Sequence, residues 1–352
     1  MTQAPPTPQA GFPHLAQLPP RVRMLTMVTA HHISHVMHVI AELGIADKVA
    51  AKPQTAGELA DETGTDTAAL ARVLDAATAV GVFRLQPDGK YEMTAEAEFL
   101  RSDVPGSVKD FAVHIGNVSR LHSYGELLNT VRTGETAFNR VHGQPVFDYF
   151  ADKPELSAPF NRAMTSFSGH AATELAKLGP FGDFSVVADL GGGHGLMLSE
   201  ILKHHSNVRG LLYDRPEVTP GAPALLEKAG VADRTTVVSG DFFSNVPEGP
   251  DAYILKSVLH DWDDGECGTI LRNVRKAIGE NTDARLFLIE AVMTEANVWD
   301  FSRILDLEML VNVGGQERTQ RGWATLLAAS GFELVKVTRA VPPNNILECR
   351  PV

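Results

Sequence analysis

Short apolar runs rich in β-branched residues recur through the second half of the chain and alternate with stretches of helical periodicity. From residue 185 onward the runs are SVVA, VRGLLYD, TTVVSGD, AYILKSVLH and RLFLIEAVM, and the chain closes with ELVKVTRA and NILECR. Strands that alternate with helices predict a mostly parallel sheet with helices on its faces. The pattern therefore predicts an α/β domain over residues 178–352, with AYILKSVLH expected to continue as a strand up to His260.

A helix is predicted over Arg21–Leu43, where apolar side chains form a broad stripe. One small domain would not cover a stripe of this width, so the helix is expected to form a dimer interface. His31, His35 and His38 share one face at metal-ligand spacing, but no Cys or carboxylate lies at matching spacing, and we expect no metal there. The Pro-rich start of the chain, Met1–Pro20, is expected to be disordered or to lie on a partner subunit.

The next stretch shows a helix-turn-helix pattern followed by two short strands. Thr55 and Glu58 form a capping box for the first helix, Thr65 or Asp66 caps the second, and a PDG turn joins the strands. This pattern predicts a winged helix. The DNA-binding form needs a basic recognition helix, whereas the second helix here has one Arg and no Lys, so a DNA-binding regulator is disfavoured. We expect residues 1–105 to form a mainly helical dimerisation domain.

A helical connector rich in aromatic residues is predicted over residues 106–177. Any one of these aromatic side chains could be an ordinary core residue. Taken together, they could form the wall of a pocket for a small aromatic substrate, with an Asn as a polar group that orients it. The residues predicted to line this pocket are Phe147, Phe150, Asn161, Met164 and Phe167.

The charge balance narrows the range of partners. The 352 residues carry a net charge of -12, with a pI of about 5.5, which disfavours nucleic acid or an anionic membrane as the main partner. Two cysteines give no disulfide framework, and we find neither a signal peptide nor an apolar run that predicts a membrane span. We expect a cytoplasmic protein whose substrate is a small molecule.

The most informative stretch is SVVADLGGGHGLML, in which a buried strand is followed by four glycines and then a helix. Gly191 and Gly193 would permit positive φ angles and the close approach of a nucleotide-type cofactor at the strand end. A dinucleotide fingerprint needs a third glycine where Leu196 stands, so a nicotinamide oxidoreductase is the less favoured alternative. Asp189, just before the glycines, suits a cofactor with a cationic amino group.

Titratable residues lie at or near the ends of successive predicted strands, at Asp214, Asp241, His260 and Glu290. Open α/β sheets bind ligands at the carboxyl ends of their strands. Asp214 follows the glycine loop by about 20 residues, the spacing expected of a carboxylate that binds both ribose hydroxyls. The pattern therefore predicts one site at this edge of the sheet.

Six motifs occur in a fixed order along the chain, namely DLGGGHG, LLYDRPEV, GDFF, LKSVLHDWDD, LIEAVM and GGQERT. Together they resemble the S-adenosylmethionine-dependent O-methyltransferases of the plant caffeate and hydroxyindole type and their bacterial natural-product relatives. The resemblance covers nearly the whole chain. It implies S-adenosylmethionine as cofactor, a Rossmann-like catalytic domain, a homodimer built on the winged-helix domain, and methyl transfer (EC 2.1.1.-) in secondary metabolism such as antibiotic biosynthesis.

The resemblance also implies a role for each motif residue. The methionine part of the cofactor would lie against the glycines, its ribose at Asp214 and its adenine between Asp241 and Phe242. The cofactor-binding residues expected in all are Asp189, Gly191, Gly193, Asp214, Asp241, Phe242, Phe243 and Lys256. The catalytic residues implied are His260 as general base, with Glu290 and Glu317 as the acids that flank it. The MLVNVGGQERT segment lacks the His-Asn pair of plant phenylpropanoid members, and Met309 and Asn312 are the substrate-binding residues expected there.

A general base suits methyl transfer to a phenol. A phenol with a pKa near 10 is about 0.1% ionised at pH 7, and only its anion attacks a sulfonium methyl group well. A His with the usual pKa near 6.5 would be neutral and could take the proton, while a carboxylate on its far nitrogen fixes the tautomer. We expect methylation of a phenolic hydroxyl on a small aromatic metabolite. A relative that uses the same cofactor site for decarboxylation or hydroxylation is the alternative.

Overall fold

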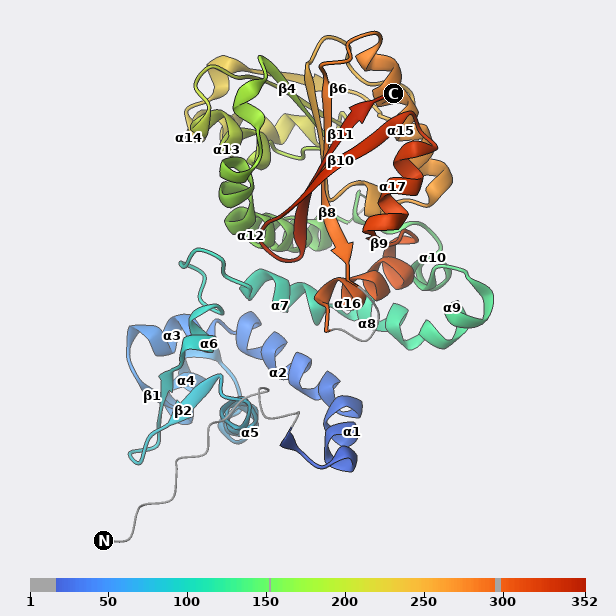
Figure 1. Ribbon diagram of the computed structural model, residues 1–352. Coiled ribbons are helices and arrows are strands. Elements are labelled where there is room, and N and C mark those ends of the chain that lie inside the picture. Colours follow the sequence, from blue (N-terminus) through green and yellow to red (C-terminus); the bar gives the residue numbers. More distant parts are fainter. Residues whose placement is uncertain (1–16, 152, 295–298) are drawn as a thin grey trace, which may run out of the picture. The chain divides into compact units, whose positions relative to one another are not determined.

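The computed structural model describes residues 17–151, 153–294 and 299–352, with some of the side chains between 154 and 170 left out. Residues 1–16, most of the predicted Pro-rich lead-in, lie outside the described part. The chain divides into two compact units, each made of two segments (Figure 1). The first unit comprises Met1–Leu121 and Phe150–Phe167, and the second comprises His122–Tyr149 and Ser168–Val352.

The first unit is mainly helical and contains the predicted winged helix. Its helices are α1 (Pro20–Val28), α2 (Ala30–Glu42), α3 (Ile45–Ala51), α4 (Ala56–Thr63), α5 (Thr67–Ala79), α6 (Ala95–Glu98) and α7 (Lys109–Ile115). Its antiparallel sheet has the order β1-β3-β2, from β1 (Gln54–Thr55), β2 (Phe83–Leu85) and β3 (Lys90–Met93). The capping box of Thr55 and Glu58 is confirmed, and Asp66 rather than Thr65 caps α5.

The single helix predicted over Arg21–Leu43 is wrong, because α1 and α2 are separate helices that meet at Thr29. Thr29 has φ -96° and ψ 4°, and its hydroxyl donates to the carbonyl of Leu25. Such a local bond competes with continuation of the helix. No residue of α1 is buried, and Leu25 and Val28 are 50% and 65% exposed. The apolar face of α1 therefore needs a further surface to cover it.

The second unit is a Rossmann-like α/β fold around a mostly parallel sheet, as predicted. The strand order is β10-β11-β8-β7-β4-β5-β6, with β9 beside β8. The strands are β4 (Val186–Leu190), β5 (Arg209–Asp214), β6 (Thr235–Ser239), β7 (Ala252–Lys256), β8 (Arg285–Met293), β9 (Arg318–Thr319), β10 (Phe332–Arg339) and β11 (Asn344–Pro351). Strands β4 to β8 run parallel, and β10 and β11 are antiparallel at one edge.

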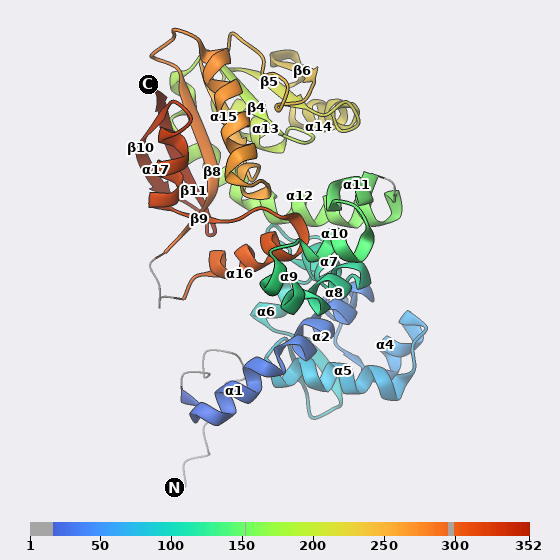
Figure 2. The same cartoon turned by 90° about the vertical axis from the view of Figure 1, so that its right-hand side faces the viewer.

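Helices cover both faces of this sheet (Figures 1 and 2). One apolar core lies between the strands and helices α15 and α17, and the other lies between the strands and helices α12, α13 and α14. The helices of this part of the fold are α12 (Pro154–Leu178), α13 (Leu196–His204), α14 (Ala222–Ala229), α15 (Asp264–Ile278), α16 (Phe301–Glu308) and α17 (Gln320–Ala328). The order in which successive strands join the sheet reverses between β4 and β7, the position where open α/β sheets bind ligands.

The connector predicted to be helical is helical. It contains α8 (Val118–Gly125), α9 (Leu127–Thr133), α10 (Ala137–His142) and α11 (Val146–Ala151), and it continues into α12. Short helical turns complete the second unit, namely η2 (Phe181–Asp183), η3 (Thr219–Gly221), η4 (Ala232–Arg234), η5 (Leu259–Asp261) and the π-helical turn η6 (Met309–Val313). None of the helices in the described ranges is long and apolar enough to cross a membrane.

Candidate active site

The glycine loop after β4 is open on one side. Gly191, Gly193 and Gly195 have φ angles of 67°, 59° and 87°, values that L-residues with side chains rarely adopt. A Cβ added to Gly193 would have no atom within 4 Å, so the backbone there is free for close approach by a ligand. The loop lies at the carboxyl end of β4, where the strand order reverses. The predicted nucleotide-type loop therefore has the required conformation and position.

Asp189 lies beneath this loop. A Cβ on Gly192 would lie 2.6 Å from Cγ of Asp189, which explains why only glycine fits at position 192. Asp189 is 0% exposed and neither carboxylate oxygen has a hydrogen-bond partner among the described residues. Burial raises the pKa of Asp189 to about 7, while the charge of Lys256 opposes the shift. The Asp189 side chain packs against the glycine loop at Gly192. Direct contact between Asp189 and a cofactor stays a prediction.

Asp214, at the end of β5, is bound to the same loop. Its Oδ2 accepts the N–H of Gly193 at 2.7 Å, and its Oδ1 accepts the N–H of Arg215 at 2.7 Å. Each oxygen of a carboxylate has a further lone pair for a hydroxyl donor. Asp214 thus holds the loop in shape and keeps the acceptors that a ribose diol needs.

Asp241 follows β6 and caps the turn that carries two aromatic rings. Its carboxylate accepts the N–H of Phe243 at 2.9 Å and the hydroxyl of Ser244 at 3.0 Å. The rings of Phe242 and Phe243 meet edge to face, with centroids 5.1 Å apart. The ring of Phe242 reaches the glycine loop, because a Cβ on Gly191 would lie 3.4 Å from it. Together, these groups offer an aromatic surface beside the loop.

These residues fit S-adenosylmethionine. The open backbone at Gly193, the carboxylate of Asp214 and the ring of Phe242 match the parts of a nucleoside that carries an amino acid. Lys256, at the end of β7, is half-buried, and burial lowers its pKa while the charges of Asp189 and Glu290 oppose the shift. Lys256 therefore interacts electrostatically with Asp189, next to the cofactor loop, and with Glu290 on β8.

Residues 257–261 follow β7 and carry His260, and we call this segment the catalytic turn. The strand ends at Lys256, so the prediction of a strand up to His260 is wrong, and His260 lies in the short helical turn η5. Ser257 has φ 52°, a strained value for a residue with a side chain. Oε1 of Glu290, on β8, accepts the next two backbone N–H groups, those of Val258 at 3.0 Å and Leu259 at 2.9 Å. The fully buried Glu290 carboxylate thus shapes the turn that carries the histidine.

His260 is surrounded by carboxylates. Its Nδ1 lies 2.9 Å from Oε1 of Glu317 and 3.4 Å from Oε2 of Glu290, so Glu317 is the closer hydrogen-bond partner. Its Nε2 lies 3.5 Å from Oδ1 of Asp261. The three predicted catalytic residues are therefore brought together. Asp261 was missed by the sequence interpretation, although its place next to His260 in the HDW motif could have indicated it.

The carboxylates change the protonation of His260. Burial lowers its pKa, but the charges of Glu290, Asp261 and Glu317, with the hydrogen bond to Glu317, outweigh burial and raise it to about 10. Burial raises the pKa of Glu290 to about 7 and that of Asp261 to about 6, against the charge of His260. The raised pKa favours the imidazolium at pH 7, whereas the sequence predicted a neutral imidazole. Three carboxylates around one half-buried imidazole favour the imidazolium.

A buried arginine holds the turn from the other side. The guanidinium of Arg318, 5% exposed, donates to the carbonyls of Leu259 and Trp262 at 3.1 Å each and to Oδ1 of Asp264 at 2.7 Å. The N–H of Gln316 donates to the carbonyl of His260 at 2.9 Å. Gln316 therefore binds the catalytic turn through its backbone and Arg318 binds it through its side chain. Glu317, between them, supplies the carboxylate for His260.

Within the described residues, the one group of side chains with donor atoms close enough for a metal ion is His260, Glu290 and Glu317. Its shortest separation, 2.9 Å from Nδ1 to Oε1, is that of a hydrogen bond. His31, His35 and His38 do not form such a group. Nδ1 of His35 instead forms a hydrogen bond with the carbonyl of His31, at 2.6 Å.

The predicted substrate-binding residues are divided between the units. Met309 and Asn312 lie in η6 of the second unit, buried at 6% and 4% exposure, and Phe147, in α11, is half-buried there. Phe150, in the first unit, packs on Phe160 with ring centroids 4.9 Å apart, the contact of a core residue. Met164 is half-buried in α12. The side chains of two more α12 residues, Asn161 and Phe167, lie outside the described part, and the aromatic pocket stays a prediction.

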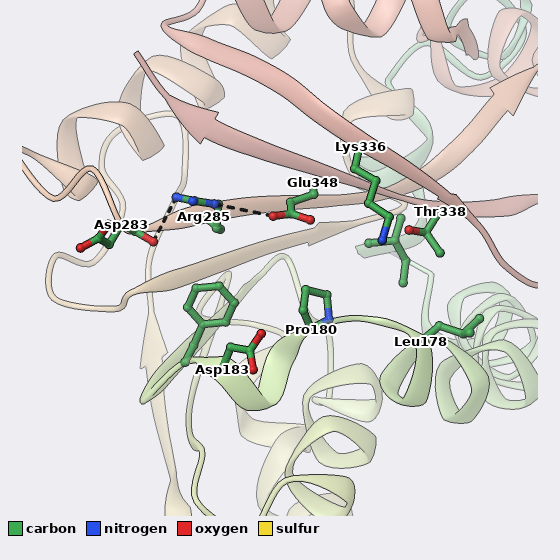
Figure 3. Close-up of a pocket in the computed structure, with 10 residues that line it drawn as sticks. Leu178, Pro180, Asp183, Asp283, Arg285, Lys336, Thr338 and Glu348 are labelled. Atoms are coloured by element: carbon green, nitrogen blue, oxygen red, sulfur yellow. Dashed lines mark hydrogen bonds and ion pairs between the residues drawn. The ribbon is translucent and has the colours of Figure 1, made fainter.

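A polar cavity of about 450 Å³ lies elsewhere in the second unit (Figure 3). It is lined by Asp183, Arg285 and Glu348, among others, and Nε of Arg285 lies 3.7 Å from Glu348. Arg285 is the first residue of β8, whereas Glu290 lies near the other end of that strand. The cavity therefore opens at the amino end of the parallel strands, away from the glycine loop and His260.

Comparison with known proteins identifies the family. Residues 124–333 match the O-methyltransferase domain, and residues 25–103 match the O-methyltransferase dimerisation domain. The chain belongs to the S-adenosylmethionine-dependent O-methyltransferases. This family assignment confirms the resemblance in the sequence motifs, the S-adenosylmethionine cofactor and the methyltransferase activity (EC 2.1.1.-).

Several relatives of this O-methyltransferase come from bacterial natural-product pathways. It is 39% identical to a phenazine O-methyltransferase, PhzM, of Lysobacter antibioticus, over 94% of this chain and 96% of that protein. It is 34% identical to an 8-amino-8-demethylriboflavin N,N-dimethyltransferase of Streptomyces davaonensis, over 90% of this chain and 92% of that protein.

Solved structures share the fold of this O-methyltransferase. The crystal structure of LaPhzM, 39% identical, superposes with a TM-score of 0.88 over 95% of this chain and all of that one. The structure of NcsB1, an O-methyltransferase from neocarzinostatin biosynthesis, is 30% identical, with a TM-score of 0.78 over 91% of this chain and 96% of that one. It was solved in complex with S-adenosylmethionine and 2-hydroxy-5-methyl naphthoic acid.

Proposed function

We propose that this enzyme transfers the methyl group of S-adenosylmethionine to a phenolic hydroxyl of a small aromatic metabolite, with His260 as the base. The observation that carries the proposal is the position of His260. Its Nδ1 is held at 2.9 Å by Glu317, and Nε2, which lies 3.5 Å from Oδ1 of Asp261, is the nitrogen that exchanges a proton with the acceptor in this proposal. Glu290 and Glu317 act as positioning residues, since one shapes the turn and the other fixes the ring.

The charge on the cluster decides how the proton moves. A neutral imidazole with a phenol holds the same number of protons as an imidazolium with a phenolate. With the pKa of His260 raised to about 10, close to that of a phenol, the proton is shared almost evenly between the two. Both forms carry one proton fewer than the resting imidazolium with a neutral phenol, so methylation of a weakly acidic phenol is expected to speed up as the pH rises from 7 to 9.

The cofactor-binding residues are Gly191, Gly193, Asp214, Asp241, Phe242 and Lys256 in this proposal. When bound, S-adenosylmethionine supplies a methyl carbon made electrophilic by its sulfonium. His260 first loses its Nε2 proton to solvent. The acceptor oxygen then gives its proton to Nε2 and forms the O–CH₃ bond as the bond from carbon to sulfur breaks, which restores the imidazolium.

The aromatic substrate class is supported by the relatives, which act on a phenazine and, in the structure of NcsB1, bind a naphthoic acid. One relative methylates nitrogen, which makes N-methylation the second candidate. A neutral aromatic amine carries its own lone pair and needs no base before the attack. His260→Gln should therefore slow an amine acceptor far less than a phenol acceptor.

Mass analysis of the products tests the proposal. The enzyme is incubated with S-adenosylmethionine and paired acceptors, a phenol and the matching aniline, at pH 7 and pH 9. The proposal expects one added methyl group on the phenol, and more product at pH 9. Methylation of the aniline alone would favour the second candidate. Loss of carbon dioxide or gain of oxygen without a methyl group would identify the decarboxylating or hydroxylating alternative.

The dimerisation domain indicates a homodimer, and we propose that α1 supplies part of its interface. Met24, Leu25, Met27 and Val28 are each at least half exposed in the single chain. A stable dimer interface that includes this helix would bury more than about 1,000 Å² in total. Light scattering is expected to give twice the chain mass at micromolar concentration, and a monomer mass would contradict this proposal.

A further inference from the structure

The two aromatic residues beside the glycine loop are held through their backbone by a helix. Nδ2 of Asn273, in α15, donates to the carbonyl of Phe242 at 2.9 Å and to the carbonyl of Phe243 at 2.9 Å. Both partners are carbonyl oxygens, which only accept, so the Asn273 atom that faces them is the NH₂ group. Each of its two hydrogens serves one carbonyl. Asn273 therefore fixes two consecutive peptide groups of the turn after β6.

Asparagine is a poor residue for the interior of a helix, because its short amide competes with the backbone for hydrogen bonds. Asn273 is half-buried in α15, between the core residues Leu271 and Val274. Its NH₂ group binds the turn after β6 instead of its own helix. A leucine at this position would suit the helix better. The amide at position 273 is therefore explained by the turn that it binds.

The rings of the same two residues pack at the start of α15. The ring of Trp262 meets that of Phe243 edge to face, with centroids 4.8 Å apart and planes at 86°, and its centroid lies 6.4 Å from that of Phe242. Trp262 follows the catalytic turn and precedes Asp263, the N-cap of α15. The aromatic pair is thus held by its rings at the start of α15 and by its backbone at Asn273, farther along the helix.

We propose that Asn273 is a positioning residue for cofactor binding, which holds Phe242 and Phe243 in place for the adenine of S-adenosylmethionine. This inference rests on the proposed function, in which Phe242 is a cofactor-binding residue. A Cβ on Gly191 would lie 3.4 Å from the ring of Phe242, so the ring is next to the glycine loop. Contact between a base and an aromatic ring depends on the position and plane of the ring, so a shift of its backbone weakens that contact. Asn273 itself touches no part of the cofactor in this proposal.

Two ligands separate the adenine end from the rest of the cofactor. S-adenosylhomocysteine carries the adenine, whereas S-ribosylhomocysteine keeps the sugar and the amino acid without it. Asn273→Leu keeps the approximate size of the side chain, suits a helix and cannot donate. Calorimetry should show the Kd for S-adenosylhomocysteine raised roughly tenfold in this variant and that for S-ribosylhomocysteine changed about twofold or less, because only the turn loses its donor. Asn273→Gln keeps an NH₂ group and should recover part of the affinity.

Asn207→Leu is a control that removes a similar hydrogen bond elsewhere. Nδ2 of Asn207 donates to the carbonyl of Gly182 at 3.0 Å, at the amino end of the parallel strands. Its loss should leave both Kd values unchanged. If Asn273→Leu lowers the melting temperature sharply, Asn273→Asp gives the second test, since an ionised carboxylate of the same size cannot donate either. Equal losses of affinity for both ligands, or an unchanged Kd for S-adenosylhomocysteine in both variants, would overturn the proposal.

Phe242→Leu distinguishes this inference from the proposed function. It removes the ring, leaves the backbone carbonyl for Asn273, and should also weaken the binding of S-adenosylhomocysteine alone. If Phe242→Leu changed neither Kd, the adenine site of the proposed function would be wrong, and this inference would fail with it. If Phe242→Leu weakened the binding of S-adenosylhomocysteine while the Asn273 variants did not, only this inference would be overturned.

Discussion

The glycine loop after β4 and the catalytic turn after β7 follow neighbouring parallel strands, yet they are built in different ways. The loop is shaped by its own glycines, at φ angles of 67°, 59° and 87°, with Asp214 binding one N–H. The turn is shaped by distant side chains. Glu290 accepts the N–H groups of residues 31 and 32 positions away, and Arg318 donates to carbonyls 56 and 59 positions away.

This difference matters for function. Glycines allow a ligand to approach the backbone, as the empty space above Gly193 shows. Buried carboxylates surround His260 with negative charge and alter its proton affinity. The loop is thus suited to binding and the turn to proton transfer, and the two should respond separately to mutation.

The largest expected effect comes from the turn. His260→Gln removes the proposed base, so kcat for a phenol with a pKa near 10 should fall roughly a hundredfold or more. The Kd for S-adenosylmethionine should change by about twofold or less, because the cofactor loop does not depend on this side chain. Methyl-transfer kinetics and calorimetry measure both. If the variant turned over the phenol at the wild-type rate, His260 would not be the base, and catalysis would rest on the proximity of the two reactants.

A second prediction concerns Glu290 and pH. The folded chain keeps a proton on Glu290 up to a pKa of about 7, whereas the unfolded chain loses it near 4.5. Stability from this group is therefore lost as the pH rises from 4.5 to 7. Glu290→Gln keeps an acceptor for the two N–H groups but cannot titrate. Between pH 4.5 and 8, the free energy of unfolding of the wild type should fall relative to the variant by up to about 3 kcal/mol.

Denaturant unfolding at several pH values measures this difference. Parallel pH profiles for the wild type and Glu290→Gln would mean that Glu290 titrates normally. The Asp261 carboxyl and His260 have raised pKa values too, so their contributions to stability also decrease with rising pH.

The smallest of these effects concerns the loop. Asp214→Ala should weaken S-adenosylmethionine binding by about 2 kcal/mol, because the ribose hydroxyls lose a charged acceptor and Gly193 loses its partner. Asp251→Ala is the matched control. Asp251 accepts the N–H groups of Ser185 and Val186 at the other end of β4, at 2.9 and 2.7 Å. Its loss should lower stability and leave cofactor affinity unchanged, and equal losses of affinity in both variants would contradict a direct role for Asp214.

Local features of the sequence predicted the fold and the loop. Apolar runs gave the strands of the second unit, and the spacing of Gly191, Gly193 and Leu196 indicated a loop that is not a dinucleotide fingerprint. The break at Thr29 was missed, because the apolar stripe continues across it while the helix does not.

Long-range features could not be predicted in the same way. The motifs indicated His260, Glu290 and Glu317 as site residues. They did not indicate that Glu290 accepts backbone N–H groups, or that Asp261 adds a third carboxylate beside the histidine. The pKa of His260 depends on the burial and separation of groups that lie 30 to 57 residues from it in the sequence.

The protonation of His260 tests the central claim most directly. Enzyme labelled with ¹⁵N in its histidine rings is titrated from pH 5 to 11 by NMR, and His260→Gln assigns the signal. We predict an imidazolium that stays protonated through pH 8 and titrates near pH 10, because Glu317, Glu290 and Asp261 surround the ring. Titration at or below about pH 6.5, the usual value for histidine, would contradict the account of the carboxylate cluster.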